Sequence, residues 1–122
     1  MNKEISKRAT AKSVVLHHLG AFQDNNLDAV MDDYTNESVL ITSDATYKGI
    51  KEIKEFLGGF MQYFPKPAST IELNKLEENG DLVYINWHAK TPTLLVPFAT
   101  DTFIIKAHKI HRQTFGGELK FT

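Results

Sequence analysis

The sequence contains no cysteine. This absence excludes disulfide bonds, thiolate zinc sites, iron–sulfur clusters and a cysteine nucleophile, and it fits a reducing compartment, so we expect a cytoplasmic protein. A glycine-rich phosphate loop is lacking too, because Gly58-Gly59 and Gly116-Gly117 do not have the x-G-x-x-G spacing. We interpret the first glycine pair as a helix irregularity and the second as a strand end.

The sequence also has almost no excess of charge of one sign, and it has no long apolar run. Fourteen Lys and Arg oppose fifteen Asp and Glu, which gives a net charge of −1 and no field that would attract nucleic acid or an anionic membrane. No stretch approaches the roughly 18 apolar residues of a membrane span, and the first dozen residues are polar and mixed in charge. We expect no nucleic-acid partner, no membrane partner and no export signal.

What is present suits one domain with a single core. The chain has 122 residues, of which 42% are hydrophobic and 11% aromatic. A chain of this length matches one domain, which we expect to span residues 1–122 with its core at about 9–118. Its rings can fill a core and still line a cavity.

Helical periodicity dominates the first half of the chain. Residues 9–25 form an amphipathic pattern in which His18 lies at the edge of the apolar stripe and His17 on the polar side. The stripe consists of Ala11, Val15, Leu19 and Phe22. Further helices are predicted at 27–34 and 51–63, separated by a short strand at 39–42 and a turn at Ser43-Asp44.

After Pro65 and Pro67 the period changes to two. Strands are predicted at 70–78, 81–91, 98–107 and 109–115, with Asn79-Gly80 as a hairpin turn and a loop from Thr91 to Pro97. In the second strand one face is wholly apolar: Val83, Ile85, Trp87 and Ala89. Helices followed by a meander indicate the α+β class, with helices on one face of a curved antiparallel sheet.

Three stretches of this order are similar to a known superfamily. They are LDAVMDDYTNESVLITSDATYKGIKEIKEF, GDLVYINWHAKTP and PFATDTFIIKAHKIHRQTF. In them the chain resembles the nuclear-transport-factor-2-like superfamily, particularly its SnoaL-like branch, which is related to ketosteroid isomerases. The resemblance implies a cone-shaped, cystatin-like fold in which the sheet wraps the long N-terminal helix around a deep apolar pocket. Such pockets serve isomerases, cyclases and dehydratases, and also proteins without catalysis.

Asp101 is the first candidate for chemistry. Strand alternation places it on one face with Phe103 and Ile105. Burial there would raise the pKa of its carboxyl and make it an acid or a neutral hydrogen-bond donor near pH 7. The resemblance implies the same role, because the matching isomerase position holds a protonated aspartic acid. Alternatives are an Asp bonded to a core Tyr or His, or one turned to solvent by a bulge.

His18 is the second candidate, because the helix edge points it toward whatever the sheet encloses. A histidine there can donate a hydrogen bond, shuttle a proton or pair with Asp101. By resemblance, its position matches the oxyanion-hole tyrosine of the isomerases. The alternative is a packed histidine with one satisfied nitrogen.

The isomerase parallel fails at the general base. The resemblance places that aspartate on the first strand, where this sequence has Thr42, a hydroxyl that cannot abstract a carbon-bound proton. Asp44 follows two residues later, in a turn where Asp commonly bonds to the local backbone. Whether Asp44 replaces the missing base is left open.

The remaining pocket candidates are mostly aromatic. We predict that the ligand-binding residues are Phe22, Thr42, Phe56, Phe60, Trp87, Phe103, Gln113 and Phe115. Core packing is the alternative for each ring. The five histidines include no pair with a nearby carboxylate at ligand spacing, so we expect no metal site and no cofactor.

Three functions follow from these residues. The first is a cofactor-free isomerase, dehydratase or cyclase that uses Asp101 and His18 on a small apolar compound. The second is a non-catalytic binder of such a molecule. The third is a dimeric interaction module. In each case a homodimer through the outer sheet face is expected, where Tyr84, Asn86, His88 and Lys90 alternate with the inward residues.

Overall fold

The computed structural model describes residues 10–122, so the predicted helix start at residue 9 lies outside the described part of the chain. Helix α2 spans Ala11–Gln23 and begins where the Thr10 side chain accepts a hydrogen bond from the Ser13 amide. The short helix α3, Leu27–Met31, is capped by Asn26. The polar residues Asp24, Asn25 and Asn26 therefore end one helix and start the next.

The second predicted helix is too long, and the first strand too short. Helix α3 ends at Met31, and strand β1 covers Tyr34–Ile41. Residues 32–34 leave the helix because Tyr34 pairs with Ile110 of a distant strand. Strand β2, Thr46–Lys48, was not predicted, and helix α4 covers Gly49–Met61. No irregularity interrupts α4 at Gly58-Gly59, where one was expected.

Four long strands complete the chain: β3 at Thr70–Asn79, β4 at Leu82–Lys90, β5 at Leu94–Lys106 and β6 at Lys109–Phe121. The hairpin turn at Asn79-Gly80 is confirmed, and Gly80 has a φ of 59°. Two boundaries were wrong. Strand β5 starts before Pro97 because a bulge between Leu95 and Phe98 accommodates the proline, and β6 continues through Gly116-Gly117.

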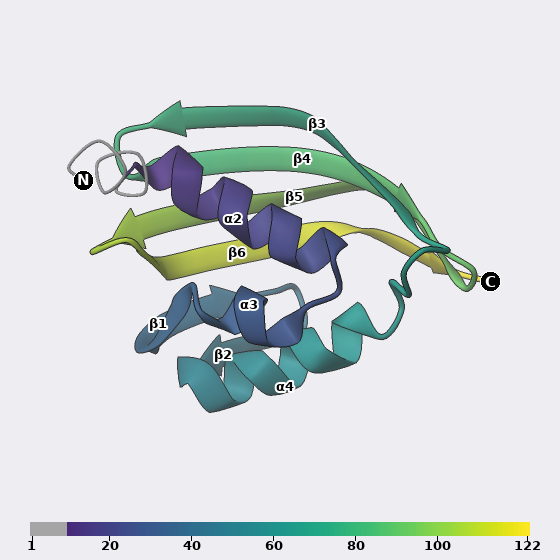
Figure 1. The fold of residues 1–122 in the computed structure, drawn as a ribbon, viewed down its shortest axis with the longest axis horizontal. Helices are drawn as coiled ribbons and strands as arrows, with labels where there is room; N and C mark the ends of the chain where they lie inside the picture. The colour runs from purple at the N-terminus through teal and green to yellow at the C-terminus, as the bar shows by residue number, and fades with distance from the viewer. Residues whose placement is uncertain (1–9) are drawn as a thin grey trace.

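The strands form one six-stranded sheet in the order β2-β1-β6-β5-β4-β3. All neighbours are antiparallel except β1 and β6, which are parallel. The sheet is thus mixed at one ladder instead of wholly antiparallel. It curves around α2, which lies across the face of β3 to β6, while α3 and α4 lie beside β1 and β2 (Figure 1). The predicted α+β class with a curved sheet around the long helix is confirmed.

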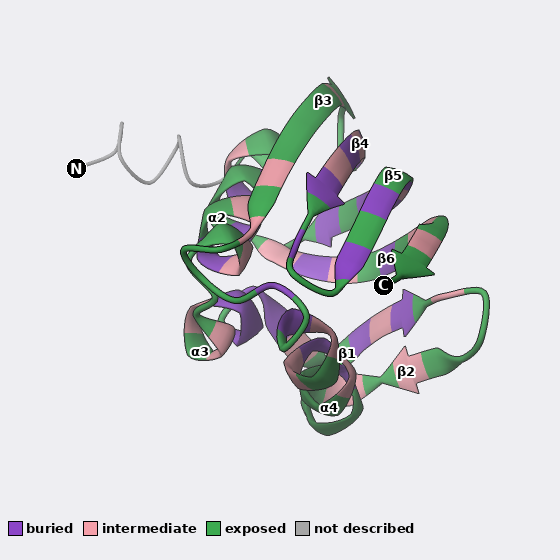
Figure 2. Ribbon diagram, turned by 90° about the vertical axis from the view of Figure 1, so that its right-hand side faces the viewer, coloured by how far each residue is buried: buried purple, intermediate pink, exposed green. Residues whose placement is uncertain are grey.

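The core fills the concave side of the sheet. Figure 2 shows buried residues alternating with half-buried ones along β4 and with mostly exposed ones along β5. The four predicted inward residues of β4 are buried: Val83, Ile85, Trp87 and Ala89. Within residues 10–122, none of the helices is long and apolar enough to cross a membrane.

Candidate functional site

A cavity lies between α2, α4 and the concave sheet face. Nine of the ten residues predicted for the site line it: His18, Phe22, Phe56, Phe60, Trp87, Asp101, Phe103, Gln113 and Phe115. The others that line it were not predicted: Leu19, Gln23, Leu40, Leu57, Ile71, Leu73 and Ile85. The structure thus brings together residues from seven elements, and their functional roles stay predictions.

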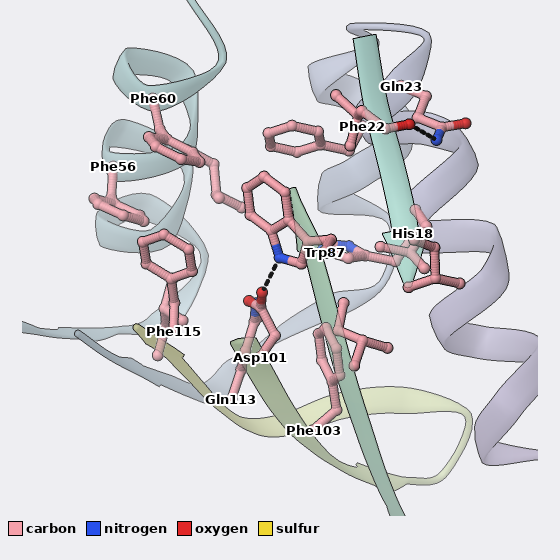
Figure 3. Close-up of a pocket in the computed structure, with 16 residues that line it drawn as sticks. His18, Phe22, Gln23, Phe56, Phe60, Trp87, Asp101, Phe103, Gln113 and Phe115 are labelled. Atoms are coloured by element: carbon pink, nitrogen blue, oxygen red, sulfur yellow. Dashed lines mark hydrogen bonds between the residues drawn. The ribbon is translucent and has the colours of Figure 1, made fainter. Parts of the chain in front are cut away.

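Asp101 is buried at the centre of β5. It is 7% exposed, and its strand neighbours are Ile85 of β4 and Phe115 of β6. Trp87 Nε1 donates to Oδ1 at 2.9 Å and Gln113 Nε2 donates to Oδ2 at 2.9 Å (Figure 3). Burial raises the pKa of the Asp101 carboxyl, although these two hydrogen bonds and the nearby His18 oppose the rise.

Asp101 was expected within hydrogen-bond reach of His18 or of a ligand between them. Its hydrogen bonds to described side chains go to Trp87 and Gln113 and not to His18, whereas a ligand between the two stays a prediction. Gln113 in turn accepts a bond of 2.5 Å from the Tyr34 hydroxyl. It therefore bridges Asp101 to Tyr34 and does not satisfy His18.

Tyr34 is a site residue that sequence reasoning missed. It is 4% exposed, and burial, together with the charges of Asp101 and Asp33, raises the pKa of its hydroxyl well above the ordinary value. The sequence pattern placed Tyr34 on a helix. Only the parallel pairing of β1 with β6 brings it to Gln113, and no local signal predicts that pairing.

His18 projects from α2 into the core. It is 4% exposed and packs edge-on against Tyr34 and Phe103, with ring centroids 5.7 and 5.6 Å away. It is more buried than Leu19, so the apolar stripe is centred on His18 and His18 does not mark its edge. Its Nδ1 has no hydrogen-bond partner among residues 10–122 and lies 3.7 Å from Asp33 Oδ2.

Asp33 also contacts His17, the histidine next to His18 in the sequence. The His17 side chain is 54% exposed, as its polar-side position predicts, yet its Nδ1 lies 3.0 and 2.9 Å from the two Asp33 oxygens. The Asp33 side chain is only 10% exposed. Sequence reasoning missed Asp33 because it interpreted residues 32–34 as the end of a helix.

Thr42 does not line the cavity. Strand β1 ends at Ile41, and the Thr42 hydroxyl accepts bonds from the amides of Asp44 and Ala45, both at 3.2 Å. Asp44 is exposed in the same turn. The β1 residue that reaches the cavity is Leu40, because the chain turns away from the sheet after Ile41.

Aromatic rings form most of the cavity wall. Phe56 and Phe60 of α4 are stacked with 6.0 Å between centroids, and Phe115 lies 5.4 Å from Phe60 and 6.2 Å from Trp87 (Figure 3). The volume that the centre of a water molecule can occupy inside the cavity is about 60 Å³. By the same measure, one buried water needs roughly 10–15 Å³. The cavity therefore has room for several water molecules. Within residues 10–122, no three His, Cys, Asp or Glu side chains are grouped to hold a metal ion.

A curved sheet with helices on its concave face and a cavity between them defines the nuclear-transport-factor-2-like class. The SnoaL-like domain model matches residues 15–113, and the chain belongs to this family. No curated protein matches the sequence.

Solved structures share the fold at low identity. A proposed polyketide cyclase from Sinorhizobium meliloti is 18% identical, with a TM-score of 0.70 over 84% of this chain and 92% of that one. A proposed ketosteroid isomerase from Kribbella flavida is 7% identical, with a TM-score of 0.73 over 92% and 80%. TerC, co-crystallised with polyporic acid, is 15% identical, with a TM-score of 0.71 over 88% and 91%. At these identities the likenesses show the fold alone.

Proposed function

We propose that the protein binds a small, flat, largely apolar molecule that carries a carbonyl or hydroxyl group, and that Asp101 and His18 act on that group without a cofactor. The observation that carries this proposal is a buried carboxyl with a raised pKa, facing the same aromatic-walled cavity as a buried histidine. The related cyclase and isomerase structures support a reaction of the isomerase, dehydratase or cyclase type.

The two polar groups suit proton transfer at a carbonyl compound. A protonated Asp101 donates a hydrogen bond to a carbonyl oxygen, and this bond strengthens as negative charge develops there. His18 is the second group, because an imidazole accepts and releases protons near neutral pH. The apolar rings exclude water and hold the flat part of the ligand.

A non-catalytic binder is the second candidate, and one observation favours it. Both Asp101 oxygens already accept bonds from Trp87 and Gln113, which is how a structural carboxyl is satisfied. The two candidates agree about the ligand and differ only in turnover.

The probe 2-tetralone, a flat ketone, separates the two candidates. NMR in D₂O measures both its binding and the exchange of its α-protons. We expect binding, and exchange about a hundredfold or more above buffer, because positioned acid–base groups contribute about 10²–10⁴-fold. Asp101→Asn should lower the exchange rate at least about tenfold. Asp44→Asn, in the exposed turn, should leave the exchange rate unchanged. Binding without faster exchange would establish the non-catalytic binder, and no binding would contradict both.

We also propose that two copies pair through the outer sheet face. Leu82 and Ile104 are directly opposite each other in the β4–β5 ladder and are each 43% exposed, beside outward-facing polar residues such as Tyr84. A mixed apolar and polar face of this kind is typical of a homodimer interface. The lack of cysteine supports a cytoplasmic location.

A further inference from the structure

The strongest unexplained feature of the site is the buried Nδ1 atom of His18. Within the described part of the chain this atom has no hydrogen-bond partner, although the His18 side chain is only 6% exposed. Among the acidic side chains of residues 10–122, only Asp33 brings an atom into ion-pair range of it, with Oδ2 at 3.7 Å. A buried polar atom without a partner needs a physical explanation.

We infer that Asp33 is a positioning residue for His18: its carboxylate keeps the imidazole proton on Nδ1, so that Nε2 is the bare acceptor that faces the cavity. A neutral imidazole carries its proton on one nitrogen only, and the group that faces the other nitrogen decides which. A bare Nδ1 would direct its lone pair at a carboxylate, whereas Nδ1–H directs a positive hydrogen at it. The second arrangement is electrostatically favoured.

The surroundings of His18 support this assignment. Tyr34 and Phe103 contact the ring edge-on and fix its plane, and neither offers a hydrogen bond to Nδ1. The oxygens of Asp101 are bonded to Trp87 and Gln113. When Nδ1 faces Asp33, the geometry of the ring directs Nε2 away from Asp33 and toward the cavity that His18 lines.

His17 does not exhaust the acceptor capacity of Asp33. It contacts both carboxylate oxygens through a single nitrogen, and two carboxylate oxygens have about four lone-pair sites. One buried carboxylate therefore serves an exposed and a buried histidine together.

This inference rests on the proposed function only for its chemical consequence, which is that His18 supplies the base that Thr42 cannot supply. The α-proton of a ketone passes to Nε2, the C–H electron pair forms the carbon–carbon double bond of an enolate, and the π pair of the carbonyl moves onto its oxygen. The enolate oxygen is held by protonated Asp101. The resulting imidazolium is stabilised by the Asp33 carboxylate until the proton returns to carbon.

Long-range ¹H–¹⁵N spectra of ¹⁵N-histidine-labelled protein report the tautomer of each ring. The His18 signal is assigned by its loss in His18→Gln, and the measurement is made on the high-pH plateau where the ring is neutral. We expect a protonated-type nitrogen at Nδ1 and an unprotonated one at Nε2. The opposite tautomer in the unsubstituted protein would overturn the inference, and this result does not depend on any variant folding.

Asp33→Asn tests the cause, with Asp32→Asn as the matched control because Asp32 is the exposed neighbouring carboxylate. We expect Asp33→Asn to remove the Nδ1–H preference and to lower 2-tetralone exchange about tenfold or more, with binding kept. Asp32→Asn should change neither. An unchanged His18 tautomer in folded Asp33→Asn would overturn the inference.

The two readouts separate this inference from the proposed function. An Nδ1–H tautomer without faster exchange would leave the positioning role intact and contradict catalysis. Faster exchange with the Nε2–H tautomer would support catalysis and overturn the role of Asp33.

Discussion

At the scale of single residues, the hydrogen bonds around Asp101 have a direction. The Tyr34 hydroxyl donates to Gln113, Gln113 donates to Asp101, and Trp87 donates to Asp101. An amide has both a donor and an acceptor end, so a rotated Gln113 reverses its part of the chain. An asparagine at position 101 can therefore accept from Trp87 and donate to a rotated Gln113. Asp101→Asn should preserve the packing of the site while removing its titratable proton.

A comparison of the natural chain with Asp101→Asn isolates the pH dependence of stability that the Asp101 carboxyl causes. Because burial raises the folded-state pKa of Asp101 above its ordinary value of 3.8, the folded protein keeps a proton that the unfolded chain has lost. The contribution to stability is therefore largest below pH 3.8 and falls as the pH rises to the folded-state pKa. The unfolding free energy of the natural chain relative to Asp101→Asn should fall by up to about 1.4 kcal/mol per pH unit in that window.

Urea unfolding of both proteins between about pH 3.5 and 8 measures this difference, and the other titrating groups cancel because both chains share them. The same subtraction with Asp44→Asn, in an exposed turn, should give a flat line. A difference for Asp101→Asn that rises with pH would show that the folded-state pKa is lowered, and it would remove the acid from the proposed site.

At the scale of elements, strands β5 and β6 approach each other closely next to the residues that line the cavity. Ala99 pairs with Gly117, and two residues along the same ladder Asp101 pairs with Phe115. A Cβ atom on Gly117 would lie 2.8 Å from Ala99 Cβ and 2.9 Å from the Phe98 carbonyl oxygen. A side chain there would push apart two strands that carry site residues.

Gly117→Ala should therefore destabilise the protein by about 1–3 kcal/mol, the usual cost of overpacking. Gly116→Ala is a matched control, since a Cβ there meets nothing within 4 Å, and its effect should stay within about 0.5 kcal/mol. Thermal and urea unfolding measure both variants. Equal stability of the two would show that β5 and β6 can separate freely at this point.

At the scale of the whole molecule, the helices cover one face of the sheet and leave the other open. A dimer through that open face predicts that Ile104→Glu, 43% exposed on β5, weakens self-association. Leu16→Glu is the matched control, because Leu16 is 46% exposed on α2, away from the outer sheet face. Light scattering at high micromolar concentration measures the mass.

The expected mass is twice 13.8 kDa for the natural chain and for Leu16→Glu, and it should fall toward 13.8 kDa for Ile104→Glu. A charge buried without a partner at an interface is costly, which is why one Glu is enough. A natural chain that scatters as a single copy would refute the pairing.

Local periodicity was enough to predict several features of the fold. Period 3.6 predicted the long helix and the inward position of His18, and period two placed Asp101 on the face of Phe103. Asn79-Gly80 predicted its hairpin because turn chemistry is local. Most residues of the cavity wall were predictable for this reason, since each is an inward position of a strongly periodic element.

The polar partners of these residues depend on contacts between distant parts of the chain. Tyr34 reaches Gln113 because β1 pairs in parallel with β6, between residues 79 positions apart in the chain. Asp33 meets His18 because the same pairing ends α3 early and turns the chain toward α2. Thr42 leaves the cavity because β1 ends one residue before it. Long-range strand pairing depends on the packing of the whole chain, so no local pattern of residues records these contacts.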